Sequence, residues 1–227
     1  MRALLFVAAL TLAACVSAPG ASDRPPPFSG NSPTQTTTSQ ALPPATYPTS
    51  VDLPAGAYRN DPHHSSVIWR IRHQGLAWLT GRFDTTTAEL TLDPADPSHS
   101  SLNVSIDAHS VDTGVLGAQG QRGFDNDVAG YIGANTTPQI TFVSTGIQRT
   151  GQNTAQVTGN LTLNGQTHPA TLDVTYDGGH TDPLRGHTAI GFSAHTTIQR
   201  SQWGVSTMSQ FAGDDVQIVI EMELVKA

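Results

Sequence analysis

The sequence predicts an all-β domain, an antiparallel barrel or sandwich, that follows an N-terminal leader and an extended tether. The main observation is that apolar and polar residues alternate through most of the chain after residue 54. A period of two is typical of strands that bury one face. The second observation is an Asn-Gly pair between two alternating segments, and the third is a content of 21 Gly and 15 Pro in 227 residues, which leaves little sequence for helices.

Residues 1–14 have the pattern of a signal peptide of the lipoprotein type. Arg2 supplies a positive charge, and the apolar run Ala3–Leu12 is too short to span a bilayer as a mature helix. Leu12–Cys15 resembles a bacterial lipobox, in which cleavage precedes the cysteine and lipid is attached to it. An ordinary cleaved signal is the alternative. The lipobox predicts a membrane anchor at Cys15 and a periplasm-facing lipoprotein of the cell envelope, and Val16 after the cysteine favours the outer membrane.

Residues 15–54 form a segment rich in Pro, Ser and Thr with few apolar side chains. Such a composition cannot offset the entropy that ordering would remove, so we expect a disordered tether. A flexible coil of this length spans about 35 Å root-mean-square. An O-glycosylated stalk is the alternative. The folded domain is expected to cover residues 55–227.

Eight segments of this domain alternate between apolar and polar residues, which predicts eight half-buried strands. Most are joined by short connections, which favours antiparallel pairing. The segments are Val67–His73, Ala88–Asp93, Leu102–Ala108, Ile140–Phe142, Val157–Leu163, Ala170–Tyr176, Ile190–Ile198 and Val216–Leu224.

The Asn164-Gly165 pair predicts a hairpin with a two-residue type I′ turn. This turn would place Leu163 opposite Gln166, Leu161 opposite His168, and Asn160 opposite Pro169. The apolar residues of both strands then fall on one face of the hairpin. A shift of the pairing register by one residue would turn the apolar residues of one strand toward water.

Two stretches break the period of two and predict short helical turns and loops across one end of the sheet. Gly117–Ala134 is glycine-rich and carries Phe124 and Tyr131, while Arg200–Asp215 carries several apolar side chains. Apolar residues in long loops are expected to cover other apolar surface.

Six stretches occur in an order that resembles the YceI-like polyisoprenoid-binding family, a lipocalin-like group of periplasmic lipid-binding proteins. The stretches are GAYRNDPHHSSVIWRIRHQGLAWLTGRF, IDAHSVDTG, PQITFVST, VTGNLTLNGQTHPATLDVTY, GFSAHTTIQRSQWGV and VQIVIEMEL. The resemblance implies an eight-stranded antiparallel lipocalin-like β-barrel around an elongated apolar cavity. It implies as ligand a polyisoprenoid, quinone-like or fatty-acyl chain, and it implies that the chain can pair as a homodimer. The lipobox and the tether depart from the soluble members, and the Gly-rich segment before Ile140 departs from the family's charged one.

An eight-stranded barrel can be filled by side chains or can hold one small ligand. Small residues at inward positions, namely Ala88, Ala108, Gly159, Ala170, Ala194 and Thr196, favour an unfilled interior. A packed core, suited to a structural or adhesion module without catalysis, is the alternative. The predicted cavity residues are Trp69, Ile71, Trp78, Phe83, Leu90, Val104, Ile106, Phe124, Tyr131, Phe142, Leu161, Leu172, Val174, Phe192, Trp203, Met208, Ile218 and Ile220.

His73 and Arg200 lie where strands end, and they are the candidates for contact with a ligand head group. A structural role is the alternative for both. For Asp107 and Asp112 we expect a structural role, either capping a loop or pairing with a cation.

The remaining observations argue against other functions. A net charge of −7 without a Lys or Arg cluster argues against nucleic-acid binding. Nine histidines and one cysteine show no zinc-binding spacing, so we expect no metal. Gly191–His195 contains a serine but lies within a predicted strand and lacks the final glycine of a nucleophile elbow. The sequence therefore predicts no enzyme and no cofactor other than a bound lipid.

Overall fold

The computed structural model describes residues 53–181 and 186–227. The predicted signal peptide, the lipidation site Cys15 and the tether up to residue 52 lie outside this part of the chain. Among the described residues, no helix has both the length and the apolar character needed to cross a membrane.

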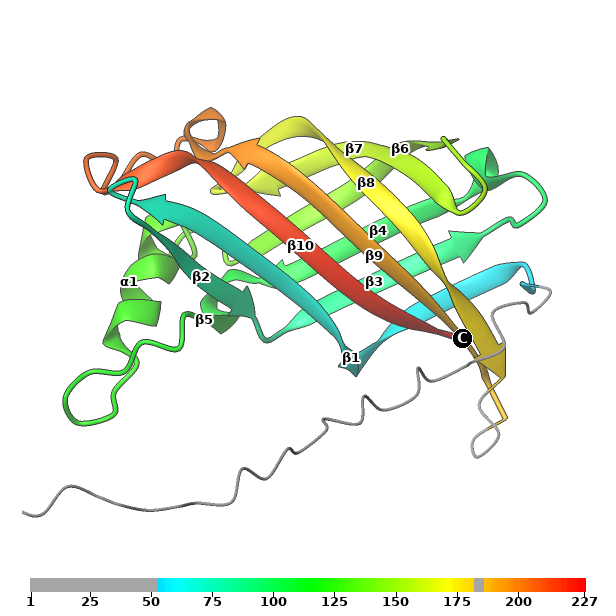
Figure 1. Cartoon of the computed structure of the whole chain (residues 1–227), viewed down its shortest axis with the longest axis horizontal. Helices are drawn as coiled ribbons and strands as arrows, with labels where there is room; N and C mark the ends of the chain where they lie inside the picture. Colours follow the sequence, from blue (N-terminus) through cyan, green and yellow to red (C-terminus); the bar gives the residue numbers. More distant parts are fainter. Residues whose placement is uncertain (1–52, 182–185) are drawn as a thin grey trace, which may run out of the picture. The chain divides into compact units, whose positions relative to one another are not determined.

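Eight strands close into an antiparallel barrel (Figure 1), as the sequence and the family resemblance predict. Around the ring they follow the order β1, β3, β4, β6, β7, β8, β9, β10, and pairing of β10 with β1 closes it. The bounds are β1 Gly56–His73, β3 Thr86–Leu92, β4 Ser101–Asp107, β6 Gln139–Arg149, β7 Thr154–Leu163, β8 Gln166–Thr181, β9 Thr188–Gln199 and β10 Ala212–Lys226.

The first strand is longer than predicted and changes partner along its length. Its start, Gly56–Arg59, pairs with β3, while Val67–His73 pairs with the additional strand β2 (Ala77–Phe83). Between them the Asn60 side chain donates to the Thr86 carbonyl (3.1 Å) and accepts from the Ala88 N–H (2.7 Å). The stretch between Asn60 and Ser65 is polar, contains a proline and forms a bulge, so its residues do not alternate. The sequence pattern therefore predicted only the second half of β1.

The hairpin between β7 and β8 has the predicted register. Leu163 faces Gln166, Leu161 faces His168, and Asn160 faces Pro169. Asn164 and Gly165 have φ values of 50° and 71°, as a type I′ turn requires. The Asn164 amide also donates to the Trp203 carbonyl (3.0 Å), so the turn supports a segment far along the chain.

Short helices cover one end of the barrel, as predicted. Figure 1 shows the helix α1 (Gly123–Tyr131), the strand β2, the two-residue strand β5 (Val111–Asp112) and the connection between β9 and β10 at this end. The connection contains the 3₁₀ helix η3 (Arg200–Trp203), and two further 3₁₀ turns, η1 (Pro97–His99) and η2 (Ala108–Ser110), flank β4.

The buried carboxylate of Asp125 holds α1 in place. It accepts from the N–H (2.9 Å) and hydroxyl (2.5 Å) of Thr113 and from Nε of Arg122 (2.5 Å). Burial by itself raises the pKa of Asp125, but the hydrogen bonds from Thr113 and Arg122 outweigh it and hold this pKa below its usual value. Arg122 also pairs with Asp112 (3.1 Å), which has the expected structural role. Asp107 has one too, because its carboxylate accepts from the His109 N–H at the start of η2.

Candidate ligand cavity

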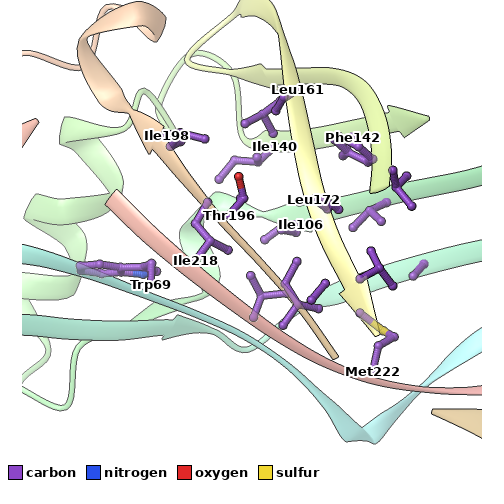
Figure 2. Close-up of a pocket in the computed structure, with 18 of the residues that line it drawn as sticks. Trp69, Ile106, Ile140, Phe142, Leu161, Leu172, Thr196, Ile198, Ile218 and Met222 are labelled. Carbon is purple, nitrogen blue, oxygen red and sulfur yellow. The ribbon is translucent and has the colours of Figure 1, made fainter. Parts of the chain in front are cut away.

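The barrel encloses a cavity of about 780 Å³. All eight barrel strands contribute inward side chains to its wall, because every second residue of each strand points inside. Figure 2 shows Ile106 of β4, Ile140 and Phe142 of β6, Leu172 of β8 and Ile218 of β10 directed into this space. The volume lies within the range of about 300–1,000 Å³ that small-molecule sites occupy.

The wall is predominantly apolar, and most of the predicted cavity residues border it. On the strands these are Trp69, Ile71, Phe83, Leu90, Val104, Ile106, Phe142, Leu161, Leu172, Val174, Phe192, Ile218 and Ile220. Phe124 and Tyr131 of α1 and Met208 of the β9–β10 connection border it at the covered end. Contact of these side chains with a ligand stays a prediction.

The prediction that Trp78 faces the cavity is wrong. Along β2 the residues Leu79 and Phe83 border the cavity, and an odd separation from Phe83 puts Trp78 on the outer face. There its ring lies under the guanidinium groups of Arg70 (4.8 Å) and Arg72 (4.2 Å). Leu79 was missed, although its alternation with Phe83 could have identified it.

The prediction that Trp203 lines the cavity is also wrong. Its side chain is 1% exposed, and its indole N–H donates to the Leu161 carbonyl (3.0 Å). Its ring meets the edge of His168, with 5.3 Å between ring centroids. Trp203 therefore joins η3 to the β7–β8 hairpin from outside the cavity wall, because its donor needs a carbonyl that the apolar interior lacks.

Two of the small residues do not leave the free volume that the sequence predicts. A Cβ atom at Gly159 would lie 2.4 Å from Cζ of Phe142 and 2.6 Å from the Val143 carbonyl oxygen, so the aromatic ring already fills this space. Ala108 lies in η2 and is fully buried away from the cavity wall. The others, Ala88, Ala170, Ala194 and Thr196, border the cavity.

Two buried polar atoms of the wall have no hydrogen-bond partner within the described part of the chain. These are Nε1 of Trp69 and the hydroxyl of Tyr176. Burial raises the pKa of Tyr176, so its phenol stays protonated and can donate. Buried polar groups are normally paired, but neighbouring atoms cover both of these, so an acceptor in the cavity could reach them only after side chains move.

Arg200 borders the cavity, but its guanidinium is bound by the protein. It donates to the carbonyls of Gly213 (2.8 Å), Val205 (3.0 Å), Thr207 (2.8 Å) and Ala212 (3.1 Å). The side chain thereby joins η3 to the connection before β10, which supports the structural alternative. His73 also borders the cavity and is exposed at the end of β1, so it remains the better placed of the two head-group candidates.

The two ends of the cavity differ in chemistry. At the α1 end, Met208 and Phe211 both border the cavity and are 47% and 43% exposed. At the other end, polar residues of the β6–β7 turn border it, among them Gln152 and Asn153. The sequence pattern could not predict this polar end, because turn residues carry no hydrophobic period.

The expectation that no metal is bound stays a prediction. One group of metal-binding residue types comes together in the described part: atoms of Asp61, His64 and Glu223 lie within 4.8 Å of one another. Asp61 already accepts from the His63 N–H (2.8 Å) and contacts Nδ1 of His64 (3.1 Å). None of these residues borders the cavity.

The fold and the cavity together define a class of proteins: closed antiparallel barrels of eight strands that enclose an apolar space. The chain belongs to the YceI-like family, since the model of the YceI-like domain matches residues 58–224. A protein of Serratia proteamaculans named UPF0312 is 37% identical over 164 residues, which cover 72% of this chain and 82% of the relative. A Salmonella arizonae protein named YceI is 35% identical over 160 residues, which cover 70% and 81%.

Solved structures have the same fold. BcnA of Burkholderia cenocepacia is 29% identical with a TM-score of 0.63, and the match covers 72% of this chain and 98% of that one. A polyisoprenoid-binding domain of Saccharophagus degradans has a TM-score of 0.54 and covers 77% and 100%. Its 13% identity limits this second likeness to the fold.

Proposed function

We propose that the chain binds and carries an elongated apolar molecule, a polyisoprenoid, a quinone-like compound or a fatty-acyl chain, inside the barrel. The observation that carries this proposal is the apolar cavity of about 780 Å³. A space of this size with an apolar wall is unfavourable when empty and suits a hydrocarbon chain. A domain described as polyisoprenoid-binding has the same fold, so the fold is compatible with this class of ligand.

The energetics favour a ligand held mainly by its chain. Each buried methylene contributes about 0.8 kcal/mol, so a five-carbon isoprene unit contributes about 3–4 kcal/mol before the cost of association. That cost is about 4–15 kcal/mol, so several units suffice for micromolar binding without a strong polar contact. Affinity should therefore depend on chain length more than on the head group.

The unpaired polar atoms narrow the ligand further. Nε1 of Trp69 donates only, and the phenol of Tyr176 donates or accepts. A ligand with a carbonyl or ether oxygen that displaces the covering side chains would pair one of these groups and remove the penalty of leaving it unsatisfied. This favours quinone-like and acyl compounds over a pure hydrocarbon, with His73 as the candidate for a head group at the α1 end.

The cavity disfavours the alternative of a structural or adhesion module with a packed core. A packed barrel would fill its axis with large side chains from facing strands. Here Ala88, Ala170 and Ala194 occupy wall positions where larger residues would fill the space. The proposed function assigns no catalytic residue, because binding of an apolar chain requires only the cavity wall.

Extraction from the native host tests the proposal directly. The Cys15→Ser protein, which needs no detergent, is purified from the native host, denatured and extracted with organic solvent, and it is expected to release a stoichiometric polyprenyl, quinone-like or acyl compound, measured by mass spectrometry. An extract of a similarly prepared periplasmic protein of known ligand-free structure is the control. An extract without lipid, together with no binding of added farnesol, quinone or fatty acid, would reject the proposal.

We further propose that the chain is a lipoprotein of the cell envelope, anchored through Cys15 and facing the periplasm from the outer membrane. The supporting observation is the lipobox-like Leu12–Cys15 behind an apolar run. The mature protein is expected to begin at Cys15 with acyl chains attached, detected in its N-terminal peptide by mass spectrometry. The Cys15→Ser protein should leave the membrane fraction. A mature wild-type chain that begins at another residue, without lipid, contradicts the anchor.

A further inference from the structure

Three exposed apolar side chains lie beside one end of the cavity. Leu76 is 82% exposed in the turn between β1 and β2, and Met208 and Phe211 are 47% and 43% exposed in the connection before β10. The two segments are joined, since the Gln74 N–H donates to the Phe211 carbonyl (2.7 Å) and His73 pairs with Ala212. We call these three residues the lip.

The lip is continuous with the cavity. Side chains of Met208 and Phe211 border the cavity and are also exposed, so apolar surface runs from the interior to the outside at this place. Figure 1 shows the β1–β2 turn and the connection between β9 and β10 together at the end that carries α1. An apolar chain could move along this surface without crossing water.

An aromatic side chain between two cations lies on the outer face beside the lip. Trp78 follows Leu76 by two residues and lies under the guanidinium groups of Arg70 and Arg72. Tryptophan prefers the membrane–water interface, and arginine pairs with phosphate in bidentate geometry. Nε of Arg70 donates to the Gln217 side chain (2.7 Å), and neither arginine forms an ion pair with a carboxylate of the described residues.

The remainder of the described surface lacks this combination. At the opposite end the cavity is bordered by polar residues such as Gln152 and Asn153 and by Pro94 and Pro97 of the β3–β4 connection, and the described residues there include no aromatic ring beside an arginine. Val115 and Leu116 are exposed next to each other in the connection between β5 and α1, but neither borders the cavity, and Val143 and Val219 are exposed singly within β6 and β10. Isolated apolar residues are normal on a protein surface, whereas an apolar group at the opening of a cavity marks a contact site.

We propose that the lip is a membrane-docking surface through which the apolar ligand enters and leaves. Leu76, Met208 and Phe211 would insert into the acyl region, while Trp78, Arg70 and Arg72 would lie among the phosphate head groups. This inference rests on the proposed function, because it assigns the source of the ligand: a lipid bilayer and not a partner protein.

Transfer of cis-parinaric acid from phosphatidylcholine–phosphatidylglycerol vesicles to the full chain tests the docking surface. This fatty acid fluoresces in apolar surroundings, and a quencher lipid that stays in the vesicles makes its arrival in the protein measurable as a rise in fluorescence. Leu76→Asp is expected to slow transfer at least tenfold, because burying one leucine is worth more than a factor of ten in partition. Its affinity for the fatty acid in the absence of vesicles should equal that of the wild type, since Leu76 does not border the cavity.

Val143→Asp is the matched control, because it places the same charge on an exposed residue of the outer face of the barrel, away from the lip. The transfer rate of this variant should equal that of the wild type. Trp78→Ala should slow transfer as well. Transfer by Leu76→Asp as fast as by the wild type, or a wild-type rate independent of vesicle concentration, overturns the docking surface. Transfer that needs an added protein overturns it in favour of a protein partner. Absence of any fatty-acid or farnesol binding without vesicles contradicts the proposed function itself, so the two failures are distinct.

Discussion

Arg200→Met is expected to lower the free energy of unfolding by about 3–5 kcal/mol, because it removes the common donor of four backbone carbonyls. The wild-type side chain is 7% exposed, so water replaces these bonds only after the segment opens. Methionine keeps the apolar stem and isolates the loss of the guanidinium. Urea unfolding at equilibrium measures the change as a shift of the midpoint at constant slope.

Two further variants separate the structural role of Arg200 from contact with a ligand. Arg149→Met should change stability by less than about 1 kcal/mol, because this exposed arginine donates only to the Gly151 and Gln152 carbonyls of its own turn. Arg200→Lys should recover only part of the lost stability. A lysine ammonium has three donors and cannot bind all four carbonyls as the planar guanidinium does. If Arg200→Met kept full stability and lost only lipid affinity, the structural assignment would be wrong.

Ala194→Trp is expected to weaken binding of a long polyprenyl chain by about two to three orders of magnitude. Ala194 lies between Val174 and Ile220 on the cavity wall, so an indole there would occupy space along the axis. Loss of room for one isoprene unit removes about 3–4 kcal/mol of burial. Displacement of cis-parinaric acid by geranylgeraniol measures the loss, and the shorter farnesol should lose less.

His195→Trp is the matched control, because it puts the same side chain at the next position of β9. The His195 side chain is 72% exposed and points to the outer face near Asp173. This variant should bind geranylgeraniol as the wild type does, and both variants should show one cooperative melting transition. An Ala194→Trp protein that folds and binds with unchanged affinity would disprove the assignment of the cavity as the binding site.

The ring of strands and much of the cavity wall could be predicted because alternation is a local property. A residue's face in a strand follows from its neighbours, and Leu90, Val104 and Ile218 border the cavity. Alternation along β2 would also place Trp78 on the outer face, because it is five positions from Phe83. The sequence pattern does not predict Ala77–Phe83 as a strand, so this rule was not applied to it.

What the sequence determined by itself is therefore the eight segments, their antiparallel hairpins and the register at Asn164-Gly165, because each depends on residues close in the chain. Only the tertiary structure decided whether the interior is filled. Phe142 occupies the space beside Gly159, while nothing comparable fills the space beside Ala194. It also decided the partners of Arg200 and the contact of Gln74, in the β1–β2 turn, with Phe211. These features arise where distant segments pack together, and packing depends on volumes and directions that a one-dimensional pattern does not contain.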